Sequence, residues 1–155
     1  MSEQVHQRAW SMFTQIILRV SSVGTQQVKT QVGISMADFA ILLTLSKSPE
    51  GALRMGVLSE VLSFSPSRLS YLVSSLVDRK LVKKTTAETD GRGHIASITA
   101  TGQVLCDKAG DVLRSVYVDL IETALTEEEN QRLIDMLAHV NDRLGIDRVI
   151  LDMLK

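Results

Sequence analysis

The residues best suited to chemistry are gathered in one short stretch, TDGRGHI at residues 89–95, which holds a carboxylate, a guanidinium and two glycines. Such a set is compatible with a phosphate-binding loop, a catalytic loop, or a turn that offers Arg92 to an anion while Asp90 orients it. A nucleotide-binding loop needs its glycines between a strand and a helix N-terminus. Residues 81–87 and 94–99 are instead β-branched and alternating, which predicts a hairpin with this stretch at its tip.

A second set of polar side chains precedes the hairpin. Ser65 and Pro66 predict the start of a helix, because serine is a good N-cap and proline is tolerated at the first helical position. Apolar residues then recur at three- and four-residue intervals as far as Val77. The opposite face carries short hydroxyls, one arginine and one tyrosine in place of the Glu/Lys pairs of a solvated helix. Its residues are Ser67, Arg68, Ser70, Tyr71 and Ser74.

Apolar periodicity predicts the elements that position these two features. Before the polar helix and the hairpin, the sequence predicts two helices, one over residues 4–30 and one capped by Ser35. A turn at 48–51, a short strand near 52–55 and a brief helix over 56–62 are expected to follow. Expected after the hairpin are helices that begin at Thr99 and at the capping box of Thr126 and Glu129, and an apolar stripe over 146–154. The fold class is therefore mainly α with a small β-hairpin. The order predicts a winged helix-turn-helix at residues 34–100 between dimerisation helices at residues 1–33 and 101–155, in one compact domain.

Composition excludes several classes of protein. The chain has 155 residues, 45% of them hydrophobic and 23% charged, which is typical of a globular domain. No apolar run approaches the roughly 20 residues of a membrane helix, and the N-terminus has no leader pattern, so no membrane association and a cytoplasmic location are expected. The three histidines lie far apart and the single cysteine, Cys106, is expected to be a small buried hydrophobe. We therefore expect no metal, no cofactor and no enzyme activity, since no nucleophile, base and orienting group come together.

Charge is distributed unevenly along the chain. Residues 47–95 contain eight Lys/Arg and five Asp/Glu, whereas the chain as a whole has a net charge of −1. A basic middle between acidic ends favours contact between the middle and an anion.

Several motifs together resemble the MarR family of dimeric winged-helix transcription regulators. They are SPS at residues 65–67, LVSSLVDRKLV at 72–82, Asp90-x-Arg92, and ITATG at 98–102, and the resemblance covers residues 36–103 and, more loosely, the whole chain. It implies a homodimer, joined through its terminal helices, that binds a pseudo-palindromic site on double-stranded DNA and is often released by a small organic ligand. The chain departs from the family where RLSY at 68–71 replaces a common threonine and arginine arrangement, and where Lys80 replaces a common glycine.

The residues themselves support DNA contact by the helix and the hairpin. Arg68 and Tyr71 are expected to contact bases or phosphates, and the serines, including Ser65, to hold phosphates. Arg92 is expected to enter the minor groove or bind phosphate, with Asp90 orienting it or a neighbouring basic group. Lys83 and Lys84 are either phosphate contacts or ordinary strand-surface lysines.

The terminal helices indicate a second copy of the chain. Their apolar stripes are too long to face water, and a two-fold dimer would place two recognition helices about 34 Å apart, one turn of duplex. Trp10, Phe13 and Phe39 either line an effector pocket or are plain core aromatics. We predict a transcriptional regulator, most simply a repressor. The alternative is a dimeric winged-helix module for protein contact without operator binding.

Overall fold

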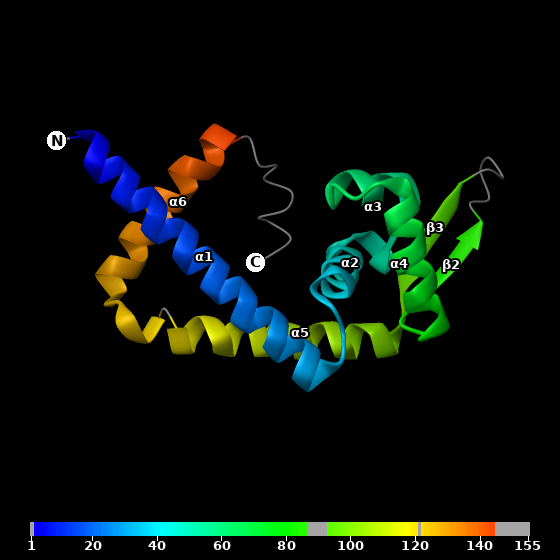
Figure 1. The fold of residues 1–155 in the computed structure, drawn as a ribbon. Helices are drawn as coiled ribbons and strands as arrows, with labels where there is room; N and C mark the ends of the chain where they lie inside the picture. The colour runs from blue at the N-terminus through cyan, green and yellow to red at the C-terminus, as the bar shows by residue number, and fades with distance from the viewer. Residues whose placement is uncertain (1, 87–92, 121, 145–155) are drawn as a thin grey trace.

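The computed structural model describes residues 2–86, 93–120 and 122–144. Its elements follow the predicted order (Figure 1): α1 (Ser2–Val32), α2 (Met36–Lys47), a 3-10 turn η1 (Pro49–Gly51), β1 (Ala52–Arg54), α3 (Met55–Val61), α4 (Pro66–Asp78), β2 (Val82–Thr86), β3 (His94–Ile98), α5 (Ala100–Leu120), η2 (Glu122–Ala124) and α6 (Glu127–Leu144). The predicted fold class, mainly helical with a small β element, is confirmed. The apolar stripe predicted over residues 146–154 lies outside the described residues.

The three strands form one antiparallel sheet in the order β1-β3-β2. In the predicted hairpin, Val82 pairs with Ile98 and Thr86 with His94. The short strand β1 adds to the other edge of β3, where Leu53 pairs with Ala96. This pairing was not predicted, because three residues carry too little alternation to show which strand they join.

The core lies where the winged module meets α5 and the C-terminal end of α1. Its buried side chains come from α2, α3, α4 and the sheet, and also from Val28 of α1 and Cys106 and Ala109 of α5. Figure 1 shows the winged module at one end of α5, with the N-terminal half of α1 and α6 toward the other end. The winged helix-turn-helix therefore shares its core with α5 and the end of α1.

Two predicted caps are present with their hydrogen bonds. Ser35 Oγ accepts from the Asp38 N–H while Asp38 Oδ2 accepts from the Ser35 N–H, both at 3.0 Å, which closes a capping box at the start of α2. Thr126 and Glu129 form the same motif at α6. Lys80, just after α4, has φ +61°, in the left-handed region that favours glycine.

Much of the apolar surface of α1 and α6 is uncovered in a single chain. Large apolar side chains on these helices are 40–69% exposed: Val5, Trp10, Met12, Phe13, Ile16, Ile17, Leu18, Ile134, Met136, Leu137 and Val140. In the described part of the chain no single helix meets the length and hydropathy of a membrane span; α1 and α2 meet them only as a pair bent by 80°.

Candidate nucleic-acid interface

Helix α4 is anchored by one face and open on the other. Leu69, Val73 and Leu76 are at most 1% exposed and pack into the core. Ser65 caps the helix by accepting the Arg68 N–H at 3.4 Å, and Pro66 occupies its first turn, as predicted. The start of α4 is therefore fixed by the residues that the sequence singled out.

The predicted contact residues of α4 lie on its open face. Arg68 is exposed and Tyr71 is 75% exposed, while Ser70 is half-buried. The exposed serines of the set are Ser65, Ser67 and Ser74. Arg68 lies over the ring of Phe64, with 4.4 Å between the guanidinium carbon and the ring centroid. The structure thus brings the α4 candidates onto one surface, with its arginine held against an aromatic ring.

The hairpin lies beside α4, and the two lysines of its first strand differ in exposure. Strand β2 contacts α4 (Figure 1). Lys83 is exposed, whereas Lys84 is half-buried on the same side of the strand as the buried Val82. Because adjacent side chains on a strand point to opposite faces, the two lysines leave the strand on opposite sides. Asp90 and Arg92, at the predicted hairpin tip, lie outside the described residues.

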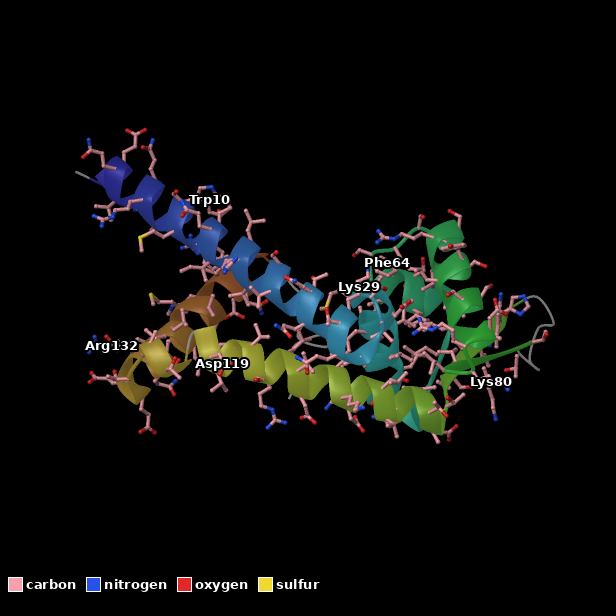
Figure 2. The ribbon with its side chains drawn as sticks, turned by 60° about the horizontal axis from the view of Figure 1, so that its bottom comes forward. Trp10, Lys29, Phe64, Lys80, Asp119 and Arg132 are labelled. Atoms are coloured by element: carbon pink, nitrogen blue, oxygen red, sulfur yellow. The ribbon has the colours of Figure 1, made fainter. Side chains whose placement is uncertain are left out.

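The three aromatic residues considered for an effector pocket do not share one within a chain. Phe39 is 8% exposed and belongs to the core cluster. Trp10 and Phe13 pair with each other on α1, with 6.5 Å between their ring centroids. Trp10 lies in the N-terminal half of α1, far from the winged module in Figure 2, and about 27 Å along the helix axis from the core residue Val28.

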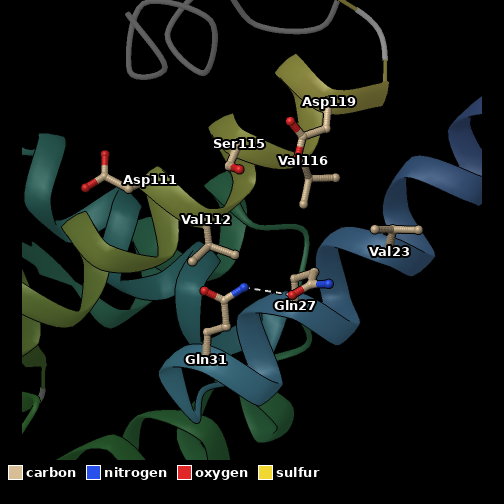
Figure 3. A pocket seen from close by; sticks show the side chains of 8 residues that line it. All are labelled: Val23, Gln27, Gln31, Asp111, Val112, Ser115, Val116 and Asp119. Carbon is tan, nitrogen blue, oxygen red and sulfur yellow. Dashed lines mark hydrogen bonds between the residues drawn. The ribbon is translucent and has the colours of Figure 1, made fainter.

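A cavity of about 450 Å³ lies instead between α1 and α5 (Figure 3). Three valines and two glutamines of these helices line it, together with a serine and two carboxylates; the lining is Val23, Gln27, Gln31, Asp111, Val112, Ser115, Val116 and Asp119. The Gln31 amide donates to Gln27 Oε1 at 2.7 Å. Sequence reasoning missed this site because its two halves lie some 80 residues apart and each half alone reads as an ordinary amphipathic helix.

Cys106 is buried on α5, as predicted. Desolvation by the core, together with the neighbouring carboxylate of Asp107, raises the pKa of the thiol to about 11. The thiolate is the reactive form of cysteine, so this side chain behaves as an apolar core residue. Among the described residues no group of three His, Cys, Asp or Glu side chains could hold a metal ion.

The fold and the open face of α4 define a winged helix-turn-helix protein, a class that binds duplex DNA. Residues 32–93 match the family model described as MarR family. The HTH-type transcriptional repressor Rv2887 of Mycobacterium tuberculosis is 26% identical over 127 residues, which cover 79% of this chain and 90% of that protein.

Two solved structures from Streptomyces coelicolor share the fold. AbsC, a MarR family transcriptional regulator, is 27% identical, with a TM-score of 0.70 over 89% of this chain and 93% of that one. Sco3205, a MarR family transcriptional regulator in complex with DNA, is 22% identical, with a TM-score of 0.77 over 90% of each chain. The predicted resemblance to the MarR family is confirmed: residues 32–93 match the family model, the chain shares its winged-helix fold with MarR-type regulators, and the proteins it matches are transcriptional regulators rather than enzymes.

Proposed function

We propose that this chain is a homodimeric repressor that binds a pseudo-palindromic operator through α4 and the hairpin. One observation carries the proposal: α4 packs three apolar residues into the core and turns its arginine, tyrosine and serines outward beside the hairpin. A helix with a compact, hydrogen-bonding outer face fits the major groove, and an adjacent hairpin reaches the flanking backbone. The likeness to the Mycobacterium tuberculosis repressor supports repression rather than activation.

The uncovered apolar surface supports the dimer. Residues 1–33 and 101–155 are assigned to dimerisation and residues 34–100 to DNA binding. Contiguous exposed apolar side chains on α1 and α6 are costly in water, and a second copy, joined about a two-fold axis, covers both sets at once. A cytoplasmic location accords with a partner that is chromosomal DNA.

Contacts with the duplex divide between bases and backbone. Arg68 and Tyr71 stand on the face of α4 that enters the groove, and the serines of that face suit phosphates. Of the two lysines, the exposed Lys83 is the better placed for a phosphate. Arg92, oriented by Asp90, is assigned to the minor groove or the adjacent backbone.

The α1–α5 cavity supports control by a small organic effector. It lies between α1 and α5, two helices assigned mainly to dimerisation, and α5 also packs into the core of the winged module, so a molecule bound there can bias how that module is held. Asp111 and Asp119 line it and no basic side chain does, which favours a neutral or cationic molecule. The role first considered for Trp10, Phe13 and Phe39 requires contacts across a dimer.

Selection from a pool of random duplexes tests the proposal. The full chain should enrich an inverted repeat and, by light scattering, bind it as two chains per duplex. Enrichment of no sequence by a folded dimer would favour the alternative, a winged-helix module for protein contact.

A further inference from the structure

Phe64 is fixed directly before α4. Its N–H donates to the Ser59 carbonyl oxygen at 3.1 Å, and its own carbonyl oxygen accepts from Ser59 Oγ at 2.6 Å. The half-buried ring packs against the core cluster. One serine of α3 therefore holds both backbone groups of Phe64 while the core holds its side chain, so the ring is a rigid platform at the start of α4 (Figure 2).

The guanidinium of Arg68 lies over this platform. The guanidinium carbon is 4.4 Å from the ring centroid, within the range of a cation–π contact. A guanidinium carries its five N–H donors in its own plane. This contact restricts the motion of the Arg68 side chain, and because Arg68 is exposed its planar set of donors can still reach a ligand.

Helix stability does not account for this arginine. Arg68 lies in the first turn of α4, where the helix dipole disfavours a positive charge. Within the described residues Arg79, Arg114 and Arg132 form ion pairs with carboxylates, whereas Arg68 forms none. The fold thus holds an exposed, unneutralised cation at the end of α4 that approaches base edges first.

We infer that Arg68 reads a guanine in each half-site and that Phe64 is the positioning residue that presents its guanidinium for this contact. Guanine offers O6 and N7 in the major groove, and a planar guanidinium binds both at once. A phosphate needs no such restriction of the side chain. The inference rests on the proposed function, because it names the base that the proposed interface recognises.

Selection from random duplexes, repeated with matched variants of the full chain, tests both roles. Wild type should enrich one guanine per half-site. Arg68→Lys keeps the charge but loses the planar fork, and its preference for that guanine over other bases should fall about tenfold or more. Phe64→Leu keeps an apolar packing side chain without a π face and should lose part of the preference, whereas Phe64→Tyr should retain it. Thermal melting checks that each variant is folded; if Phe64→Leu is not, Phe64→Met takes its place.

The outcomes separate the inference from the proposed function. Enrichment of no duplex by wild type overturns the function itself. Suppose that wild type selects an operator, but Arg68→Ala weakens binding to all sequences equally and lowers the slope of log affinity against log salt concentration by about one. Arg68 then binds a phosphate, and the guanine assignment is wrong. If a folded variant without the Phe64 ring selects guanine as sharply as wild type, the positioning role of Phe64 is wrong.

Discussion

Arg79 Nη1 lies 3.1 Å from Asp38 Oδ2, and this ion pair joins the C-cap residue of α4 to the first turn of α2. The other terminal nitrogen of Arg79 donates to the Gly33 carbonyl oxygen at 3.1 Å. Asp38 is only 7% exposed and also caps α2. The end of α1, the start of α2 and the end of α4 are therefore tied together by two side chains that are 41 residues apart.

Removing either partner should destabilise the fold. Asp38→Ala loses the cap and leaves Arg79 unpaired, and should lower the free energy of unfolding by about 2–3 kcal/mol. Arg79→Ala should cost about 1–2 kcal/mol, because its side chain is partly exposed. Urea unfolding of both single variants and of the double variant should give a coupling energy near 1 kcal/mol. The control is Asp78→Ala, at an exposed neighbouring position, which should change the free energy of unfolding by less than about 0.5 kcal/mol. If the effects of the Asp38 and Arg79 variants simply add in the double variant, the ion pair is not formed.

Gly102 should tolerate no side chain. A Cβ at this position would lie 2.1 Å from the Leu81 carbonyl oxygen, which is backbone and cannot move aside. Gly102→Ala should therefore cost about 3 kcal/mol. Gly110, on the same helix, has no atom within 4 Å of an added Cβ, and Gly110→Ala should gain about 0.5–1 kcal/mol. Thermal melting of the two variants checks this; equal effects would contradict the packing of α5 on the start of the hairpin.

Lys80→Gly should stabilise the chain. Lys80 follows the C-cap of α4 with φ +61°. Its N–H donates to the Val77 carbonyl oxygen at 2.8 Å, and the Leu81 N–H donates to the Leu76 carbonyl oxygen at 2.9 Å. Glycine adopts this conformation without steric cost, so the gain should be about 1 kcal/mol. Lys80→Ala removes the same charge and keeps the strain, and should show no gain in the same melting experiment. A gain in both variants would assign the effect to the charge.

Alkaline pH should reveal the burial of Cys106. The pKa of the folded thiol is about 11, against 9.0 for an unperturbed cysteine, so the unfolded chain releases this proton first. The stabilising contribution is complete below about pH 9 and is lost as pH rises toward 11. Urea unfolding of wild type should lose more free energy across this window than Cys106→Ala. Equal losses of free energy of unfolding in wild type and Cys106→Ala would count against a buried thiol. Alkylation of the native thiol as fast as of the unfolded one would do the same.

Local signals in the sequence were sufficient for the elements and for the face of α4. Ser35 and Ser65 were found as caps because each acts on residues within one turn, and the face of α4 follows from helical periodicity. Features formed by distant residues were not found: the pairing of β1 with β3, the α1–α5 cavity and the Asp38–Arg79 ion pair. Each depends on how separate elements pack, which periodicity within one element does not encode.

The Phe64–Arg68 contact lies between these two cases. The residues are four apart, a spacing that brings side chains together on a helix. Phe64 precedes α4, however, and its position depends on Ser59 and the positive φ of Ser63, +52°, in the turn after α3. The outer face of α4 was therefore predictable, while the platform behind its arginine was not.

We propose that two copies of α4 bind one duplex in successive turns of the major groove. The direct measurement is a titration, by fluorescence anisotropy at fixed salt, of the selected inverted repeat and of versions with added base pairs between its half-sites. Half-sites about 10 base pairs apart should bind one dimer tightly, and about five extra base pairs should weaken binding at least tenfold, because they place one half-site on the opposite face of the duplex. Equal affinity at every spacing, or one chain bound independently at each half-site, would contradict the account.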